Sequence, residues 1–180
     1  MGSDGHPAAA GAPVTRVRVE RDGDAAGIRR VHEAAFGRRA EADLVDALRG
    51  TEAWLAPLSL VAEEDGEVVG HVLLTRAALD DGTALLALAP VGVLPARQRR
   101  RVGSLLLDEA LRRAAETDAV LVVVLGDPEY YGRFGFEQAR DLGVTPPFPA
   151  PDEAWQALRL PAWRPVGGTV VYPAAFASVA

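Results

Sequence analysis

The chain has 180 residues, a formal net charge of −6 at pH 7, 49% hydrophobic residues and 24% charged residues. This length and composition are typical of one soluble globular domain with a sizeable core, and the acidic charge argues against general nucleic-acid binding. The chain has no cysteine and only three histidines, without an HExxH pattern. We therefore expect no disulfide, no thiol nucleophile and no metal site.

Residues 1–13 (MGSDGHPAAAGAP) consist mainly of glycine, alanine and proline. They lack the basic start and the apolar run of a signal peptide, so we expect a disordered tail followed by a single domain over residues 14–180. The longest uninterrupted apolar run, residues 119–125, falls well short of the ~18 residues that a membrane span needs. We therefore expect a cytoplasmic protein that has no membrane partner.

The predicted domain begins with a strand and two helices. Residues 15–20 (TRVRVE) alternate between polar and apolar side chains, which predicts a strand. Asp22 or Asp24 can cap the helix that follows, and residues 41–49 (EADLVDALR) predict a second, short helix. The inward residues are Ile28, Val31, Ala34 and Ala35 in the first helix and Leu44, Val45 and Leu48 in the second.

Residues 58–75 (LSLVAEEDGEVVGHVLLT) predict a β-hairpin, because two apolar runs flank Asp65-Gly66, a dipeptide that a tight primed turn favours. A third buried strand is predicted over residues 84–94. Pro90 lies inside this strand, and a proline cannot donate a hydrogen bond to a neighbouring strand. We therefore expect a bulge or a break in pairing at Pro90.

The strongest helix signal covers residues 101–116. Residues 119–126 (AVLVVVLG) follow as a strand, and their lack of alternation indicates burial on both faces. Asp127 and Pro128 fit the N-cap and the first position of a short helix. The apolar stripe of the strong helix is Val102, Leu105, Leu106, Ala110, Leu111 and Ala114.

Two short strands are predicted near the C-terminus, over residues 155–160 and 168–172. The whole order is then a strand, two helices, three strands, a helix, a strand, a short helix and the terminal strands. This order predicts a mixed α/β domain built around a central sheet.

The densest positive charge of this acidic chain lies just before the strong helix, where residues 94–106 (LPARQRRRVGSLL) include Arg97 and Arg99–Arg101. A nucleic-acid patch, a solvated helix end and a site for one anionic ligand all fit the charge alone. The N–H groups at a helix start lack intrahelical partners and the helix dipole is positive there, which favours a phosphate, and Gly103 would let it approach the backbone. The chain has no GxGxxG after a strand and no GK[ST], so a dinucleotide fold and a Walker loop are not expected.

These residues carry a family resemblance. Residues 91–111 (VGVLPARQRRRVGSLLLDEAL) resemble the acyl-CoA-binding motif of the GNAT acetyltransferase superfamily, V-x-P-x-x-Q-x-x-G-x-G followed by a helix. Residues 130–136 (YYGRFGF) look like its second motif, a tyrosine with Gly-Phe four residues on. The segments EADLVDALR, LSLVAEEDGEVVGHVLL, LGDPEYYGRFGF and PPFPAPDEA look like the YhbS-like branch of predicted acetyltransferases. The resemblance covers nearly everything after the tail and implies the GNAT acyl-CoA N-acyltransferase fold.

The resemblance also implies acetyl-CoA as co-substrate and the residues that bind it. A bulge at Pro90 would splay two strands apart and free N–H groups to meet the pantetheine arm and the acetyl carbonyl, where an N–H would stabilise the oxyanion. The implied contacts of the arm are Val91, Val93 and Leu94, and those of the pyrophosphate are Arg99, Arg100, Arg101, Val102, Gly103 and Ser104.

Arg101 departs from the family pattern, which usually has glycine at this position. We expect Arg101 to adopt ordinary helical dihedral angles with its side chain pointing outward, because Gly103 is retained. If the position instead needs very close approach of the ligand, the affinity for CoA falls.

The implied reaction is direct attack of a primary amine on acetyl-CoA in a ternary complex. An amine with a pKa near ~10.4 must lose a proton at neutral pH, and the CoA thiolate must be protonated. Tyr131 matches the motif tyrosine that acts as the acid in the family. The alternative for Tyr131 is a core residue with its hydroxyl bonded to the backbone. Tyr130 is expected to pack or to line a pocket wall.

No general base is evident from the sequence, and a water chain to bulk solvent is the default. Residues 84–93 contain no carboxylate, and Glu63 and Glu64 beside the hairpin turn are expected to be solvated. Other candidates are more simply explained as structural histidines, surface charges or a helix cap: His32, His71, Glu33, Glu41 and Asp127.

A non-catalytic CoA-binding or sensor protein with the same fold is the alternative function. The lack of an evident base favours it, and the presence of Tyr131 argues against it. The sequence does not select the acceptor amine, which belongs to a small molecule or to a protein. A homodimer formed through the terminal strands is compatible with the sequence.

Overall fold

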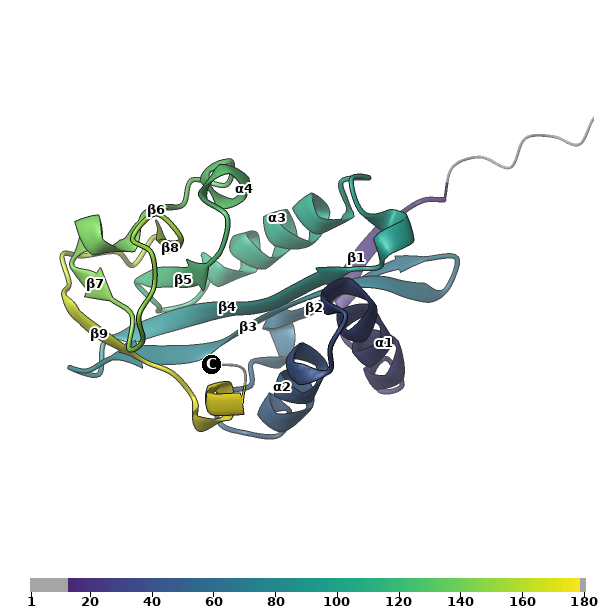
Figure 1. The fold of residues 1–180 in the computed structure, drawn as a ribbon, viewed down its shortest axis with the longest axis horizontal. Helices are drawn as coiled ribbons and strands as arrows, with labels where there is room; N and C mark the ends of the chain where they lie inside the picture. Colours follow the sequence, from purple (N-terminus) through teal and green to yellow (C-terminus); the bar gives the residue numbers. More distant parts are fainter. Residues whose placement is uncertain (1–12, 179–180) are drawn as a thin grey trace, which may run out of the picture.

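The computed structural model describes residues 13–178 (Figure 1). Apart from Pro13, the predicted tail lies outside the described residues. Within the described range, no helix combines the length and the apolar character that crossing a membrane requires.

The helices and strands agree closely with those predicted. The helices are α1 (Ala25–Phe36), α2 (Ala40–Leu48), α3 (Val102–Ala114) and α4 (Pro128–Gly132). The strands are β1 (Arg16–Val19), β2 (Ser59–Glu64), β3 (Glu67–Leu79), β4 (Ala84–Val93), β5 (Leu121–Leu125), β6 (Glu137–Gln138), β7 (Val144–Thr145), β8 (Trp155–Arg159) and β9 (Gly168–Val171). Only the short strands β6 and β7 were not predicted among the strands of the described residues, because two residues carry no alternation signal.

The sheet has the strand order β1-β2-β3-β4-β5-β8-β6, and β9 pairs with both β3 and β7. β4 and β5 are parallel, whereas β1 to β4 form consecutive antiparallel pairs. A parallel pair needs a long connection, which α3 provides here. In Figure 1, α1 and α2 cover one face of the sheet, and α3 and α4 lie over the other. The predicted mixed α/β class is therefore confirmed.

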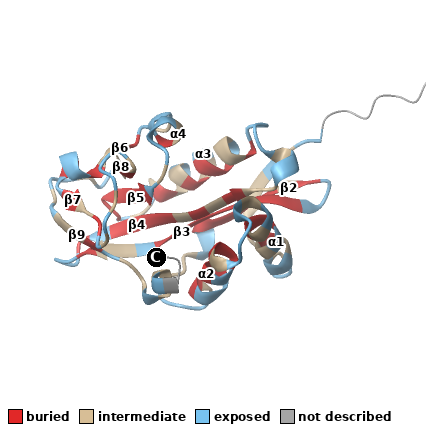
Figure 2. Cartoon of the chain, in the orientation of Figure 1, coloured by how far each residue is buried: buried red, intermediate tan, exposed pale blue. Residues whose placement is uncertain are grey.

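Buried residues run along the central strands of the sheet (Figure 2), and they form core clusters with the helices of both faces. Successive side chains of a strand point to opposite faces, so Val72 packs with Leu106 under α3, and Leu73 packs with Ile28 under α1. His71 points to the same face as Leu73 and is fully buried there. The α1 side of β3 therefore holds a polar group inside an apolar layer.

The hairpin prediction is confirmed at its turn. Asp65 has a φ of 50° and Gly66 a φ of 81°, as a type I′ turn requires. The predicted side-chain cap of α1 is wrong. Asp24 occupies the N-cap position, but its carboxylate makes no capping hydrogen bond and instead pairs with Arg18, whose Nη1 lies 2.6 Å away.

Candidate functional site

Strands β4 and β5 separate next to Pro90. Their parallel pairing ends at Ala87 and Val123, and the register between β3 and β4 shifts around Pro90. The predicted break in pairing is therefore confirmed. Beyond it, β4 runs on to Val93 with β3 as its only strand partner among the described residues.

The edge of β4 that faces away from β3 presents the backbone groups of Val91 and Val93. The Leu94 N–H donates to the Val69 carbonyl at 2.9 Å, and bonding residues alternate along an antiparallel pair, so Val91 and Val93 point the other way. From that side, Gln98 Nε2 donates to the Val93 carbonyl at 3.1 Å. The N–H groups of Val91 and Val93 therefore face the splayed edge, whereas the N–H of Leu94 is already engaged in the sheet.

The turn between β4 and α3 contains two arginines in the left-handed conformation. Arg99 has a φ of 61° and Arg101 a φ of 66°. The expectation of ordinary helical angles at Arg101 is wrong, because this residue is the left-handed N-cap of α3. A side chain in this region costs about 1 kcal/mol more than glycine, which explains why glycine suits the position. The Arg101 side chain is exposed, as expected.

The arginines of this turn divide into one that is paired and three that are not. Arg97 Nε lies 2.6 Å from the Glu64 carboxylate, which also accepts a hydrogen bond from the Thr15 hydroxyl at 2.7 Å. These two contacts, that of Thr15 first, lower the pKa of Glu64. Glu64 is only 5% exposed, so the expectation that it is solvated is wrong. Arg99–Arg101 are exposed and form no ion pair within the described part of the chain.

The first turn of α3 has no side-chain cap. The N–H groups of Val102, Gly103 and Ser104 therefore face the turn without an intrahelical acceptor, at the positive end of the helix dipole. The structure gives a different reason for Gly103 from the one expected. A side-chain carbon there would lie 2.9 Å from the Tyr130 hydroxyl, so Gly103 makes room for α4.

Tyr131 lies in α4 and belongs to the same buried cluster as Leu88 of β4 and Val124 of β5. The residue is 7% exposed, and its ring lies so close to Gly126, just after β5, that a side-chain carbon at Gly126 would overlap it. Its hydroxyl makes no hydrogen bond to any described residue, unlike a core tyrosine held by the backbone. Burial raises the pKa of Tyr131, so the hydroxyl keeps its proton at neutral pH.

His32 and His71, which lie far apart in the sequence, are in contact in the structure. His32 Nε2 and His71 Nδ1 are 2.8 Å apart, and both side chains are fully buried. Burial lowers the pKa of His32 to about 4, and burial, with His32 and Arg49 nearby, lowers the pKa of His71 well below its ordinary value. Both rings are therefore neutral. Sequence reasoning missed the pair because it depends on how α1 docks on β3.

The carboxylates considered as general bases are each paired with an arginine or with a backbone N–H group. Glu41 is buried and paired with Arg38, so the expectation of a surface charge is wrong for this residue. Glu33 pairs with Arg29 at 3.1 Å. Asp127 caps α4 by accepting the Glu129 N–H at 2.9 Å, as predicted. Among residues 13–178, no three histidine, aspartate or glutamate side chains gather as a metal ion would require.

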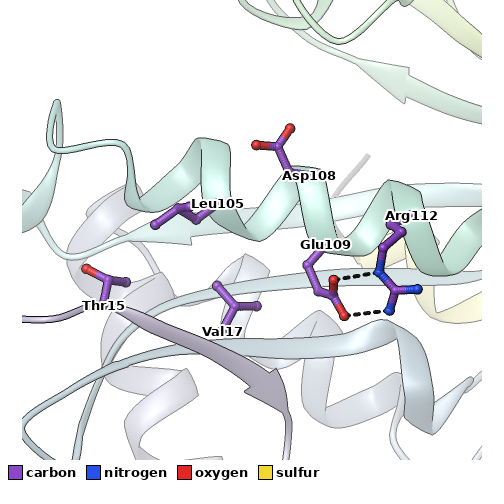
Figure 3. Close-up of a pocket in the computed structure, with 6 residues that line it drawn as sticks. All are labelled: Thr15, Val17, Leu105, Asp108, Glu109 and Arg112. Carbon is purple, nitrogen blue, oxygen red and sulfur yellow. Dashed lines mark hydrogen bonds and ion pairs between the residues drawn. The ribbon is translucent and has the colours of Figure 1, made fainter.

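A groove of about 460 Å³ lies apart from this site, between β1 and α3 (Figure 3). Its lining residues are Thr15, Val17, Leu105, Asp108, Glu109 and Arg112. The Arg112 guanidinium is already paired with Glu109 at 2.8 Å. The two acidic side chains make the groove unsuited to a phosphate, so the N-terminal turn of α3 is the better anion site.

Comparisons with known proteins give the family. The model of the acetyltransferase (GNAT) domain matches residues 57–138, which include the β4–α3 turn and Tyr131. YjhQ of Escherichia coli strain K12, an uncharacterized N-acetyltransferase, is 40% identical over 134 residues, which are 72% of this chain and 74% of YjhQ. The chain belongs to the GNAT family of N-acetyltransferases. Membership of this family makes the chain an acyltransferase, as the motifs at residues 91–111 and 130–136 predicted.

Solved structures show the same fold. YhbS from Escherichia coli, crystallised in complex with CoA, matches with a TM-score of 0.85 and 32% identity, over 92% of this chain and 93% of that chain. A GNAT family acetyltransferase from Brucella melitensis, in complex with acetyl-CoA, matches with a TM-score of 0.75 and 38% identity, over 91% and 98% of the chains. The predicted GNAT fold is confirmed.

Proposed function

We propose that this acetyltransferase moves the acetyl group of acetyl-CoA to a primary amine, which attacks the thioester directly while both substrates are bound. One observation carries the proposal. The unpaired edge of β4 leads straight into the uncapped N-terminus of α3, where Arg99–Arg101 have no ion-pair partner within the described chain. This edge suits an extended amide-containing arm, and the turn suits a diphosphate. The CoA and acetyl-CoA complexes of the relatives support the same donor.

The donor would lie along the loop and the edge of β4. The pantetheine amides would bond to the backbone of Val91 and Val93, with the Leu94 side chain beside the arm. The pyrophosphate would accept hydrogen bonds from the backbone at the start of α3, in a field made positive by the arginines. The turn residues proposed for this contact are Arg99, Arg100, Arg101, Val102, Gly103 and Ser104.

The same edge supplies the groups for acetyl transfer. An N–H of β4 that bonds the thioester carbonyl would stabilise the oxyanion of the tetrahedral intermediate, an effect of about 3 kcal/mol in other acyl-transfer sites. Tyr131 is the proposed acid that protonates the departing CoA thiolate. Its hydroxyl is free of hydrogen bonds to the described residues and stays protonated, which supports this role.

Release of free CoA thiol tests the proposal. The purified protein is incubated with acetyl-CoA and a panel of small amines, lysine-containing peptides and peptide N-termini. Thiol release that depends on one class of amine, with a matching acetylated product, is the expected result. Saturable binding of acetyl-CoA without thiol release for any class would instead favour the non-catalytic CoA-binding or sensor function.

A further inference from the structure

A chain of buried polar side chains starts at the histidine pair and crosses to the far edge of the sheet. His71 Nε2 lies 2.9 Å from the Ser59 hydroxyl on β2. Ser59 in turn donates to the Glu20 carboxylate, just beyond β1. Arg49, at the end of α2, donates to Glu20 through Nε at 3.1 Å. The chain of side chains therefore connects His32 in α1 with the ion pair between Arg49 and Glu20, in which the Glu20 side chain is 11% exposed.

The chemistry of these groups fixes the direction of every hydrogen bond. The Glu20 carboxylate only accepts, so the one hydroxyl hydrogen of Ser59 points to Glu20. Ser59 must then accept from His71 Nε2–H, which leaves a lone pair on Nδ1 of this neutral ring. That lone pair accepts from His32 Nε2–H. His32 Nδ1 is therefore unprotonated, and the whole chain is aligned away from it toward Glu20.

His32 Nδ1 lies against the strand that presents the splayed edge. A side-chain carbon at Gly92 would come within 2.8 Å of Nδ1, so the nitrogen rests on the backbone between Val91 and Val93. Nδ1 is fully buried and has no hydrogen-bond partner among the described residues. An unsatisfied buried acceptor costs about 1–3 kcal/mol, so a fold that keeps one calls for a reason.

We propose that His32, His71, Ser59 and Glu20 form a proton relay that removes the proton from the acceptor nitrogen during acetyl transfer. This inference rests on the proposed function. Because His32 is buried, one water molecule is placed between the nitrogen and Nδ1. The N–H bond of the attacking amine breaks as its proton passes to this water, and another O–H bond of the water breaks as an N–H bond forms at Nδ1. The Nε2 hydrogen of His32 moves to His71, that of His71 to Ser59, and that of Ser59 to Glu20.

The relay balances at each step and returns to its starting state. Its net result is a neutral amide nitrogen and a protonated Glu20. After the product leaves, transfer in the opposite direction restores each hydrogen and releases the proton from His32 Nδ1 to water. A weak base suffices, because the amine nitrogen becomes positively charged and strongly acidic as its bond to the acyl carbon forms.

The charges around the chain favour this arrangement. The Glu41 carboxylate on α2 raises the pKa of His32 against the effect of burial. Arg49 adds to the effect of burial at His71 and lowers its pKa further. Glu20 Oε2 lies 4.0 Å from His71 Nε2 and attracts the positive charge outward. A carboxylate therefore lies near each histidine, Glu41 near His32 and Glu20 near His71, and Arg49 keeps His71 from holding the positive charge itself.

Removal of one hydroxyl group interrupts the relay without changing the donor site. We expect Ser59→Ala to lower kcat at least tenfold, with an unchanged Kd for acetyl-CoA, an unchanged KM for the amine and a smaller solvent isotope effect. Ser59→Thr keeps the hydroxyl and should restore the rate. Thr75→Val is the matched control, because Thr75 is also buried on this sheet, its hydroxyl has no described partner, and it lies outside the chain. Equal kcat values for Ser59→Ala and Thr75→Val would overturn the relay.

Nitrogen-15 NMR of the imidazoles tests the relay without any activity. We expect His32 and His71 both to carry their proton on Nε2 at neutral pH, and His32 Nδ1 to give the signal of an unprotonated nitrogen. A protonated Nδ1 on His32 would overturn the inference, even if Ser59→Ala failed to fold. If the wild-type protein releases no thiol with any amine, the proposed function fails, and the relay for acetyl transfer fails with it. If the wild-type protein is active and Ser59→Ala has the same kcat as the wild type, the relay fails while the proposed function stands.

Discussion

At the scale of single residues, Arg101 shows how the turn before α3 can be built with an arginine at its left-handed N-cap position. The left-handed backbone of Arg101 turns the chain into α3, and its exposed side chain adds a third unpaired cation beside Arg99 and Arg100. The position therefore combines backbone strain with positive charge. The two effects can be measured separately, because strain affects folding and charge affects the binding of an anion.

Arg101→Gly should raise the free energy of unfolding by about 1 kcal/mol, because glycine adopts positive φ without a steric penalty. Denaturation by urea measures the change. Arg100→Gly is the control, since Arg100 is not among the described residues with positive φ, and it should be neutral or destabilising. If both variants lost stability equally, Arg101 would not be strained in solution.

Tyr131→Phe should lower turnover about 100-fold while leaving the Kd for acetyl-CoA unchanged, because only the proton donor to the thiolate is lost. Tyr130→Phe makes the same chemical change one residue away in α4 and should keep most of the activity. Thiol-release kinetics and calorimetry measure the two quantities. Unchanged turnover in Tyr131→Phe would remove this residue from the mechanism.

The residue-level predictions succeeded where the local sequence contains the cause. The Asp127 cap and the Asp65-Gly66 turn depend on neighbours in the chain, and both are confirmed. The pairing of His32 with His71 and the burial of Glu64 depend on contacts between distant elements. Composition and periodicity contain no signal for such contacts.

At the scale of elements, the turn before α3 is fastened to the hairpin on one side and free on the other. Arg97 joins the turn to the buried Glu64 of β2, whereas the arginines that follow point to solvent. The paired arginine therefore holds the loop in place, and the unpaired ones remain available to a ligand.

Arg97→Gln should lower the free energy of unfolding by about 2 kcal/mol, because it leaves the buried Glu64 carboxylate without its cation. Arg100→Gln should change stability by less than about 0.5 kcal/mol and should instead weaken the binding of acetyl-CoA. Urea denaturation and calorimetry on the two variants separate these effects. Equal losses of stability would contradict the division between an anchoring arginine and free ones.

Element positions were largely predictable because β3, β4, α3 and β5 each have a strong periodic or β-branched signal. The divergence of β4 from β5 was predictable in part, since Pro90 marks the position where pairing must change. Of the neighbouring strands, only the hairpin pair β2 and β3 was predicted, from the Asp65-Gly66 turn. Periodicity alone does not encode strand order.

At the scale of the whole molecule, the two sides of the sheet differ in the chemical groups that they hold. The α3 side and the splayed edge present backbone groups and cations, whereas the α1 side buries a neutral histidine pair. Buried neutral histidines make stability depend on pH. Their pKa values are lower in the folded chain than in the unfolded one, so the unfolded chain takes up more protons as the pH falls.

The free energy of unfolding should therefore fall as the pH is lowered from ~6.5 toward ~4, by about 1.4 kcal/mol per pH unit for each buried imidazole. The stabilising effect of neutral burial is complete above the unfolded pKa of ~6.5. Urea denaturation at several pH values measures the slope. His32→Gln should reduce the slope, and a stability that is constant over this range would show that the histidines are not buried as neutral groups.

The central claim is that the splayed edge of β4 and the turn before α3 bind acetyl-CoA. Calorimetric titration with acetyl-CoA, with 3′-dephospho-acetyl-CoA alongside, tests it most directly. We predict saturable binding of acetyl-CoA at one site per chain, and weaker binding of the analogue would show that the unpaired arginines also contact the 3′-phosphate. Absence of binding to acetyl-CoA would contradict the account, since it would show that Arg101 or another feature of this turn prevents the donor from binding.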